Sequence, residues 1–201
     1  MPKDFICLQC DNPTHRLILL HGWGADAEDL IPLGENLLGK SGTRLELVFL
    51  RAPQPVINSV GRQWYQLFPA DWSAVPQAVD HLKLRLKELP LEEIPIHRTF
   101  LLGFSQGGAM ALATGIDLPM AGLILCSAYP HPGWHPIGQR SPIFLTHGVN
   151  DEVVPIEASR KIIELLKTNE LESDLYEFQG GHEINEEIII QISLFIEKHI
   201  H

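Results

Sequence analysis

The sequence has few cysteines, few basic residues and no long hydrophobic run, and each shortage argues against a class of protein. Three cysteines are an odd number, which argues against a disulfide framework and favours a reducing compartment. Only 15 lysines and arginines stand against 25 acidic residues, so the formal net charge is −10 and we expect no binding to nucleic acid. The charge-free run Thr99–Ile116 contains several glycines and is too polar for a membrane span of about 20 residues.

The first residues of the chain carry no apolar stretch of the kind found in secretory signals. We therefore expect a cytoplasmic protein without a stable membrane anchor. Hydrophobic residues make up 45% of the chain, which is typical of a folded globular protein and not of a disordered one. A length of 201 residues favours a single domain over residues 1–201, whereas nothing in the composition indicates the oligomeric state.

Short apolar runs alternate with amphipathic segments along the chain. The runs are apolar at consecutive positions, which is typical of strands covered on both faces, as in a parallel sheet. The expected strands are Arg16–Leu20, Leu45–Leu50, Thr99–Phe104, Ala121–Cys126, Pro142–Thr146 and Asp174–Phe178, with Phe5–Cys10 as an edge strand. The expected helices are Ala27–Leu38, Pro76–Leu89, Ser105–Thr114, Glu157–Lys167 and Ile184–His199. This alternation predicts an α/β fold with a mostly parallel central sheet and helices on both faces.

A serine stands between two glycines at a predicted strand-to-helix turn. The segment Gly103-Phe104-Ser105-Gln106-Gly107 has the form G-x-S-x-G and follows an expected strand. In this motif a sharp turn lifts the serine hydroxyl above the sheet, and the glycines avoid collisions with the neighbouring strand and helix. The helix N-terminus behind the serine supplies positive potential for a developing oxyanion. We therefore predict that Ser105 is a catalytic nucleophile.

A serine nucleophile needs a base, and the base needs an acid that orients it. On this type of fold the chain order is serine, then an acidic residue, then histidine. Asp151 follows one expected strand and His182 follows the next, after a pair of glycines. Both positions lie at the carboxyl ends of parallel strands, the edge on which Ser105 is also expected. Glu152 as the acid and His147 as the base are alternatives, although the position of His147 before a glycine suggests that it shapes the turn.

The loop after the first buried strand has the sequence His21-Gly22-Trp23-Gly24. An early strand-to-helix loop of this kind supplies one donor of the oxyanion hole, and the residue after the nucleophile supplies the other. We therefore assign the two donors to the backbone amides of Trp23 and Gln106. We expect His21 to hold the loop in shape through hydrogen bonds.

Three further patterns have alternative interpretations. Residues 22–27 fit the dinucleotide pattern G-x-G-x-x-G/A, but the next strand does not end in the acidic residue that this pattern requires. Cys7 and Cys10 have C-x-x-C spacing, for which we prefer an ordinary strand to a redox or metal site. His131 and His135 flank Pro-Gly-Trp in an expected surface loop, and no further metal ligand stands nearby. We therefore expect no metal and no cofactor. His15 is also expected at the surface.

The connection Arg51–Val75 is 25 residues long, rich in aromatic residues, and shows no clear periodicity. Connections of this length in compact domains are usually functional or disordered, and the aromatic residues favour a folded loop at the active site. Only Tyr129–Ser141 separates two later strands, so we expect no cap domain and an open site. The apolar walls of that site are expected to come from Trp23, Trp64, Leu67, Phe68 and Val153. Trp64 and Phe68 could instead pack the long loop onto the domain.

Five ordered motifs resemble the phospholipase/carboxylesterase branch of the α/β-hydrolases, to which acyl-protein thioesterases and small bacterial carboxylesterases belong. These motifs are His21–Asp26, Ala52-Pro53 with Trp64-Tyr65, Gly103–Gly108, His147-Gly148 with Asp151–Pro155, and Gly181–Ile184. The resemblance covers the chain from about Leu17 to its end. It implies an α/β-hydrolase fold and hydrolysis of esters or thioesters by a triad of Ser105, Asp151 and His182, with Trp23, Gln106 and the Trp64 segment bordering the substrate. Gln66 stands where an acidic residue is expected, which leaves the choice of substrate open.

The sequence therefore predicts a serine hydrolase that cleaves carboxylic esters or thioesters of small or medium acyl groups through an acyl-enzyme. A (lyso)phospholipase or an acyl-protein thioesterase is the alternative, with a lysophospholipid or an acylated protein as its partner. A non-catalytic hydrolase-like binding protein and a nucleotide-binding protein are remote alternatives, because all three triad residue types occur in the expected order. The natural substrate and the preference between ester and thioester are not determined by these patterns.

Overall fold

The structure is a computed structural model that describes residues 4–9, 11–41, 44–89, 93–136, 138 and 141–200. Its strands are β1 (Phe5–Leu8), β2 (His15–Leu20), β3 (Leu45–Leu50), β4 (Gln54–Pro55), β5 (Arg62–Gln63), β6 (Thr99–Phe104), β7 (Gly122–Cys126), β8 (Ile143–Gly148) and β9 (Ser173–Phe178). Its α-helices are α1 (Ile31–Ser41), α2 (Val75–Glu88), α3 (Gln106–Gly115), α4 (Glu157–Thr168) and α5 (Glu186–Lys198). Short 3₁₀ helices are η1 (Ala27–Leu30), η2 (Trp72–Ala74) and η3 (Ile96–Arg98).

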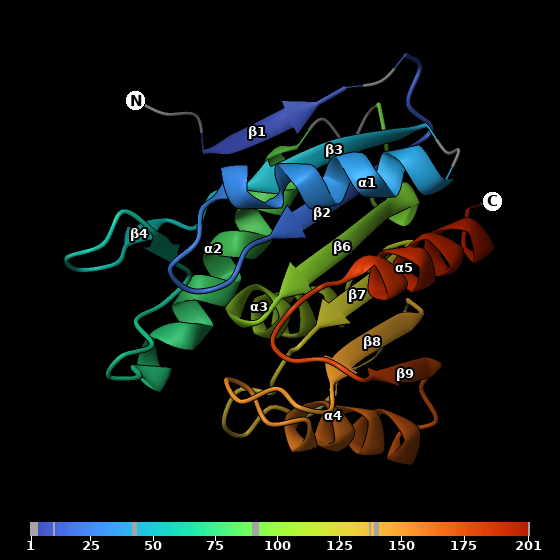
Figure 1. Ribbon diagram of the computed structural model, residues 1–201. Helices are drawn as coiled ribbons and strands as arrows, with labels where there is room; N and C mark the ends of the chain where they lie inside the picture. The colour runs from blue at the N-terminus through green and yellow to red at the C-terminus, as the bar shows by residue number, and fades with distance from the viewer. Residues whose placement is uncertain are drawn as a thin grey trace.

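Seven strands form one sheet in the order β1-β3-β2-β6-β7-β8-β9 (Figure 1). Every neighbouring pair from β3 to β9 is parallel, whereas β1 runs antiparallel to β3 at the edge. The predicted parallel sheet is confirmed. The predicted edge strand is present as β1, although Cys10, at its predicted end, lies outside the described residues.

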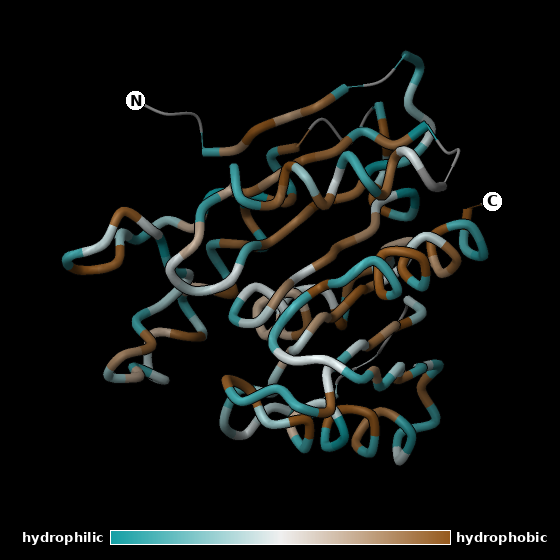
Figure 2. The backbone as a smooth tube through the Cα atoms, viewed as in Figure 1, coloured by the Kyte–Doolittle hydropathy of each residue, from teal (hydrophilic) through white to brown (hydrophobic). Residues whose placement is uncertain are grey.

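Helices cover both faces of the sheet because alternate residues of each strand face opposite sides. Leu17 and Leu19 of β2 belong to the hydrophobic core that α1 and α5 cover. Ile18 and Leu20 belong to the second core, which α2, α3 and α4 cover. Figure 1 shows α1 and α5 in front of the sheet, and Figure 2 shows that the central strands are hydrophobic along much of their length. Consecutive apolar positions in the strands are thus explained by two cores.

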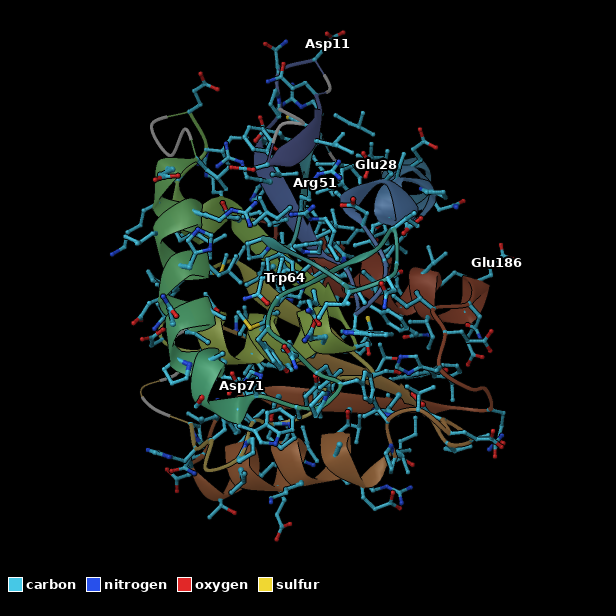
Figure 3. All side chains as sticks on the ribbon, turned by 90° about the vertical axis from the view of Figure 1, so that its left-hand side faces the viewer. Asp11, Glu28, Arg51, Trp64, Asp71 and Glu186 are labelled. Atoms are coloured by element: carbon cyan, nitrogen blue, oxygen red, sulfur yellow. The ribbon has the colours of Figure 1, made fainter. Side chains whose placement is uncertain are left out.

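The carboxyl ends of the parallel strands open on one edge of the sheet, which Figure 3 views directly. The long connection after β3 lies at this edge and contains the β4–β5 hairpin and η2. Neither element was predicted, because strands of two residues and a 3₁₀ helix of three are too short for a periodic pattern to show. Residues 127–142 link β7 to β8, a span too short to form the cap domain whose absence was expected.

One histidine lies deeper than the sequence suggested. His15 was expected at the surface, but it begins β2 and is 4% exposed, with its ring centroid 6.3 Å from that of Phe100.

Within the described ranges, no helix combines the length and apolar character needed to cross a bilayer.

A buried ion pair joins β2 to β3 near the start of both strands. Arg16 and Glu46 are 0% and 3% exposed, and Arg16 Nε donates to Glu46 Oε2. Arg16 Nη1 also donates to the carbonyl of Ile94 at 3.2 Å. Removing one charge from a buried pair is costly, because the other charge then lies in a medium of low dielectric without compensation.

We expect Glu46→Gln to lower the free energy of unfolding by about 3 kcal/mol, measured by urea denaturation followed by circular dichroism. The matched control is Asp117→Asn, which breaks the more exposed Lys83–Asp117 pair at 3.0 Å. That change should cost at most about 1 kcal/mol. Equal losses in the two variants would show that burial of the Arg16–Glu46 pair does not matter for stability.

Candidate active site

Ser105 lies in the turn between β6 and α3, with φ of 56° and ψ of −117°. Residues other than glycine rarely adopt a positive φ, so the backbone is strained here, as the nucleophile motif predicts. The Ser105 amide donates to the Cys126 carbonyl at 2.9 Å, which ties the turn to β7. Because Ser105 stands at the N-terminus of α3, unpaired amides and the helix dipole create positive potential beside its side chain.

Glycines let the backbone approach this turn closely. A Cβ on Gly103 would lie 2.2 Å from the Gly107 carbonyl oxygen, and a Cβ on Gly107 would lie 2.2 Å from the Leu20 carbonyl oxygen. A Cβ on Gly22 would lie 3.4 Å from Ser105 Cβ, so the loop after β2 passes directly beside the serine. Larger residues at the first two positions would push β6, α3 and β2 apart.

Asp151 and His182 are joined by a hydrogen bond. His182 Nδ1 lies 2.7 Å from Asp151 Oδ2, and the side chains are 19% and 0% exposed respectively. The two residues follow β8 and β9, which pair in parallel, so their turns leave the same edge of the sheet. Gly148 lets these turns meet, since a Cβ there would lie 2.3 Å from the Gly181 carbonyl oxygen.

The carboxylate of Asp151 is stabilised as an anion. The Val153 and Val154 amides donate to its Oδ1 at 2.9 Å and 2.8 Å. Burial alone would raise the pKa of Asp151, but the hydrogen bonds from His182, Val154 and Val153 outweigh it and hold the pKa below its usual value. Asp151 is therefore charged at neutral pH and suited to stabilise a protonated imidazole.

Ser105 and His182 line the same pocket. Within the part of the chain that the structure describes, no hydrogen bond joins the Ser105 hydroxyl to the His182 ring. The Phe104 ring packs against the imidazole with a centroid distance of 4.7 Å. Catalytic hydrogen bonds are often long before a substrate binds. The structure thus brings the three predicted residues to one edge and leaves the serine–histidine contact open.

Neither of the two alternative residues lines this pocket. Glu152 is exposed on the turn after β8. The His147 ring is fully buried, with Nε2 2.8 Å from the Val154 carbonyl and Nδ1 2.7 Å from the Ser159 hydroxyl. These contacts agree with a role in shaping the turn, and the burial of His147 separates it from any substrate.

His21 holds the loop after β2. Its Nδ1 lies 2.7 Å from the Gly22 carbonyl, and its Nε2 accepts from the Ala52 amide at 3.1 Å. Burial lowers the pKa of His21, so the ring is neutral and carries its proton on Nδ1. The Trp23 amide has no acceptor among the described residues, and Gln106, as the first residue of α3, has no intrahelical acceptor for its amide. Both predicted oxyanion donors are therefore available.

The Gln106 side chain fastens the long loop to the nucleophile helix. Its Oε1 accepts from the Trp64 amide at 3.0 Å, and its Nε2 donates to the Tyr65 carbonyl at 2.8 Å. The Trp64 indole donates to the His21 carbonyl at 2.9 Å. Trp64 is 2% exposed and is labelled near the middle of Figure 3, below Arg51. The expectation that Trp64 borders the substrate therefore differs from the structure, in which its ring packs the loop onto the domain.

A pocket of about 390 Å³ opens at Ser105 and His182. Its other walls are almost wholly apolar and come from Trp23, Leu67, Phe68, Tyr129, Val153, Val154, Pro155 and Ala158. Four of the five predicted wall residues are among them. The Trp23 and Phe68 rings meet edge to face at 4.9 Å, and the Trp23 indole donates to Gln63 Oε1 at 2.9 Å.

A buried polar chain behind this pocket was not predicted. The Tyr65 hydroxyl lies 2.7 Å from the Tyr129 hydroxyl and 3.0 Å from His131 Nε2. His131 is 7% exposed, which corrects its placement in a surface loop, whereas His135 is exposed. Burial lowers the pKa of His131 to about 4 and raises the pKa of Tyr129 to about 12.

The described ranges contain no group of three or more side chains suited to a metal ion.

We expect the stability of the protein to fall as the pH drops from about 6.5 to about 4. The folded pKa of His131 is below its unfolded value, so the unfolded chain takes up the proton first. The stability contributed by the neutral ring is therefore complete above the unfolded pKa and is lost as pH falls through the folded one. His131→Asn should make the decline of the free energy of unfolding shallower by about 1 kcal/mol per pH unit in that window, measured by urea denaturation. The exposed-histidine variant His81→Asn should decline as the wild type does, and a wild-type decline in His131→Asn would contradict the argument.

Comparison with known proteins identifies relatives along almost the whole chain. A family model described as phospholipase/carboxylesterase matches residues 2–200. A probable carboxylesterase of Oryza sativa subsp. japonica is 28% identical over 209 residues, which cover 92% of this chain and 77% of that protein. Acyl-protein thioesterase 1 of Yarrowia lipolytica is 28% identical over 214 residues, which cover 93% of this chain and 92% of that protein.

Solved structures show the same arrangement of elements. The crystal structure of esterase PE8 superposes with a TM-score of 0.87 at 27% identity and covers 97% of this chain and 98% of that one. The Bacillus cereus carboxylesterase superposes with a TM-score of 0.83 at 17% identity, with 98% and 94% covered, and this likeness concerns the fold alone.

Proposed function

We propose, since this chain belongs to the phospholipase/carboxylesterase family, that Ser105, His182 and Asp151 are the catalytic triad of a carboxylic ester hydrolase. The sheet and its helices form the α/β-hydrolase fold, and the family cleaves esters or thioesters. The observation that carries the assignment is the 2.7 Å bond from His182 to a buried carboxylate, in a pocket that Ser105 also lines.

In the proposed mechanism the Ser105 oxygen attacks the carbonyl carbon while His182 Nε2 takes the serine proton. Asp151 keeps the imidazole oriented and stabilises its positive charge. The amides of Trp23 and Gln106 hold the oxyanion that forms on the carbonyl oxygen. His182 then protonates the alcohol or thiol, which departs, while the acyl group stays bound to the Ser105 oxygen as an acyl-enzyme. Water repeats the sequence at the acyl carbon and releases the acid, so no step calls on a metal or an organic cofactor.

The pocket supports small or medium acyl groups as substrates. Its volume of about 390 Å³ is near the lower end of the range of about 300–1,000 Å³ for ligand pockets. Its walls offer apolar contact and few polar groups, which suits a short hydrocarbon chain. A small ester or thioester is therefore the proposed substrate of this cytoplasmic enzyme. An acylated protein is the second candidate, because relatives such as that of Yarrowia lipolytica are named acyl-protein thioesterase 1, and a lysophospholipid is the third.

We expect Ser105→Ala to lower the hydrolysis of p-nitrophenyl butyrate by about 10⁴–10⁶-fold, because the nucleophile is lost while the fold is kept. A fluorophosphonate probe should label the wild type and fail to label this variant. Ser59→Ala, at an exposed serine of the β4–β5 loop, should be labelled and active like the wild type. Wild-type activity in Ser105→Ala would exclude the proposed nucleophile.

We expect kcat/KM for p-nitrophenyl esters to be highest at about four to eight acyl carbons, because a longer chain exceeds the apolar pocket. The same assay with an acyl-cysteine peptide and a lysophospholipid compares the other two candidates, with Ser105→Ala as the blank. An optimum beyond about twelve carbons would contradict the size that the pocket implies.

A further inference from the structure

A second histidine contacts the carboxylate that orients His182. His147 is 0% exposed, and its Nε2 lies 3.3 Å from Asp151 Oδ2. The same oxygen lies 2.7 Å from His182 Nδ1. One carboxylate oxygen therefore faces two imidazoles, one of them in the pocket and the other in the interior.

The hydrogen-bond partners of His147 determine which nitrogen carries its proton. Nε2 lies 2.8 Å from the Val154 carbonyl, which can only accept, so Nε2 bears a hydrogen. That hydrogen is donated to the Val154 carbonyl, and Asp151 Oδ2, 3.3 Å from the same nitrogen, is in electrostatic contact with the N–H group. Nδ1 lies 2.7 Å from the Ser159 hydroxyl, a shorter contact than the 3.3 Å from that hydroxyl to the Ala128 carbonyl, so the hydroxyl donates to Nδ1. Burial lowers the pKa of His147, in agreement with a neutral ring.

The remaining contacts of the carboxylate leave it little freedom. Its Oδ1 accepts the amides of Val153 and Val154, which belong to the same turn. Besides His147, Oδ2 faces His182 Nδ1, and the His182 ring gains and loses a proton during the proposed reaction. The N–H of His147, a residue of β8, is therefore a second, buried contact of Oδ2 that takes no part in the proton transfer.

We propose that His147 is a positioning residue for the acid–base pair, which rests on the function proposed above. Its N–H orients the Asp151 carboxylate and draws part of the negative charge away from His182. Both effects depend on a donor at Nε2 and not on the volume of the ring. His147 therefore adjusts how strongly Asp151 holds the protonated imidazole during acylation.

Other charged groups near His147 do not compete for this role. Glu157 of α4 and Glu177 of β9 raise the negative potential around the ring. Glu177 pairs with the Arg160 guanidinium through two contacts of 2.8 Å, so part of its charge is balanced. The titratable group in direct contact with His147 is Asp151. His182 contacts the other side of the pair, through the same Asp151 carboxylate.

The test compares His147→Phe, which keeps an aromatic ring, with His147→Gln, which keeps a side-chain N–H donor. We expect kcat to fall about 10- to 100-fold in the Phe variant with KM within about twofold, because proton transfer is misaligned while the pocket is unchanged. The acid limb of its kcat/KM profile should move to higher pH by about half a unit, because Asp151 then attracts the imidazolium more strongly. The Gln variant should recover kcat to within about threefold of the wild type. His81→Phe, at an exposed histidine of α2, serves as the matched control and should change neither quantity.

Nitrogen-detected imidazole NMR of the wild type provides a measurement that no folding defect can affect. It should show His147 as the neutral ring protonated at Nε2 throughout the pH range in which the enzyme is active. A proton on Nδ1 alone, or a folded Phe variant with wild-type kcat and an unshifted acid limb, would overturn the inference. A wild type that neither hydrolyses the ester nor reacts with fluorophosphonate would instead overturn the proposed function.

Discussion

Close backbone contacts at the carboxyl edge of the sheet determine where every candidate site residue lies. The contact between Gly107 and the Leu20 carbonyl sets the nucleophile turn against β2, and the contact between Gly148 and Gly181 sets the acid turn against the histidine turn. A single methyl group at either place would collide with backbone, which has no flexible end to move aside. The geometry of the site therefore depends on positions that lack a side chain altogether.

The negative charge closest to His182 at this edge is the buried carboxylate of Asp151. Asp151 loses water on folding and regains hydrogen bonds from the Val153 and Val154 amides and from His182. Of the residues that line the pocket in the described part of the chain, none is a lysine, an arginine or an acid. An apolar setting strengthens each remaining polar interaction, because fewer water dipoles oppose it. A charge that develops on a substrate in this pocket would therefore interact with few other charged groups.

The pocket wall and the nucleophile turn are built as one unit. Gln106 contributes its amide beside Ser105, while its side chain binds the backbone of Trp64 and Tyr65 in the long loop. The same loop carries Leu67 and Phe68 on the pocket wall. Two hydrogen bonds therefore join the loop that forms this wall to the N-terminus of α3, where one donor of the proposed oxyanion hole lies.

Local patterns in the sequence determined the parallel sheet, its helices, the nucleophile turn and the candidate residues on the neighbouring turns, because hydrophobic periodicity and glycine spacing act within a few residues. Only the tertiary structure decided the burial of Trp64, which depends on a bond to His21, 43 positions away, and that of His131, which contacts Tyr65, 66 positions away. It also decided that His147 faces Asp151, because β8 and the turn after it must first fold back together. Contacts between distant segments depend on the path of the whole chain, and no local pattern encodes that path.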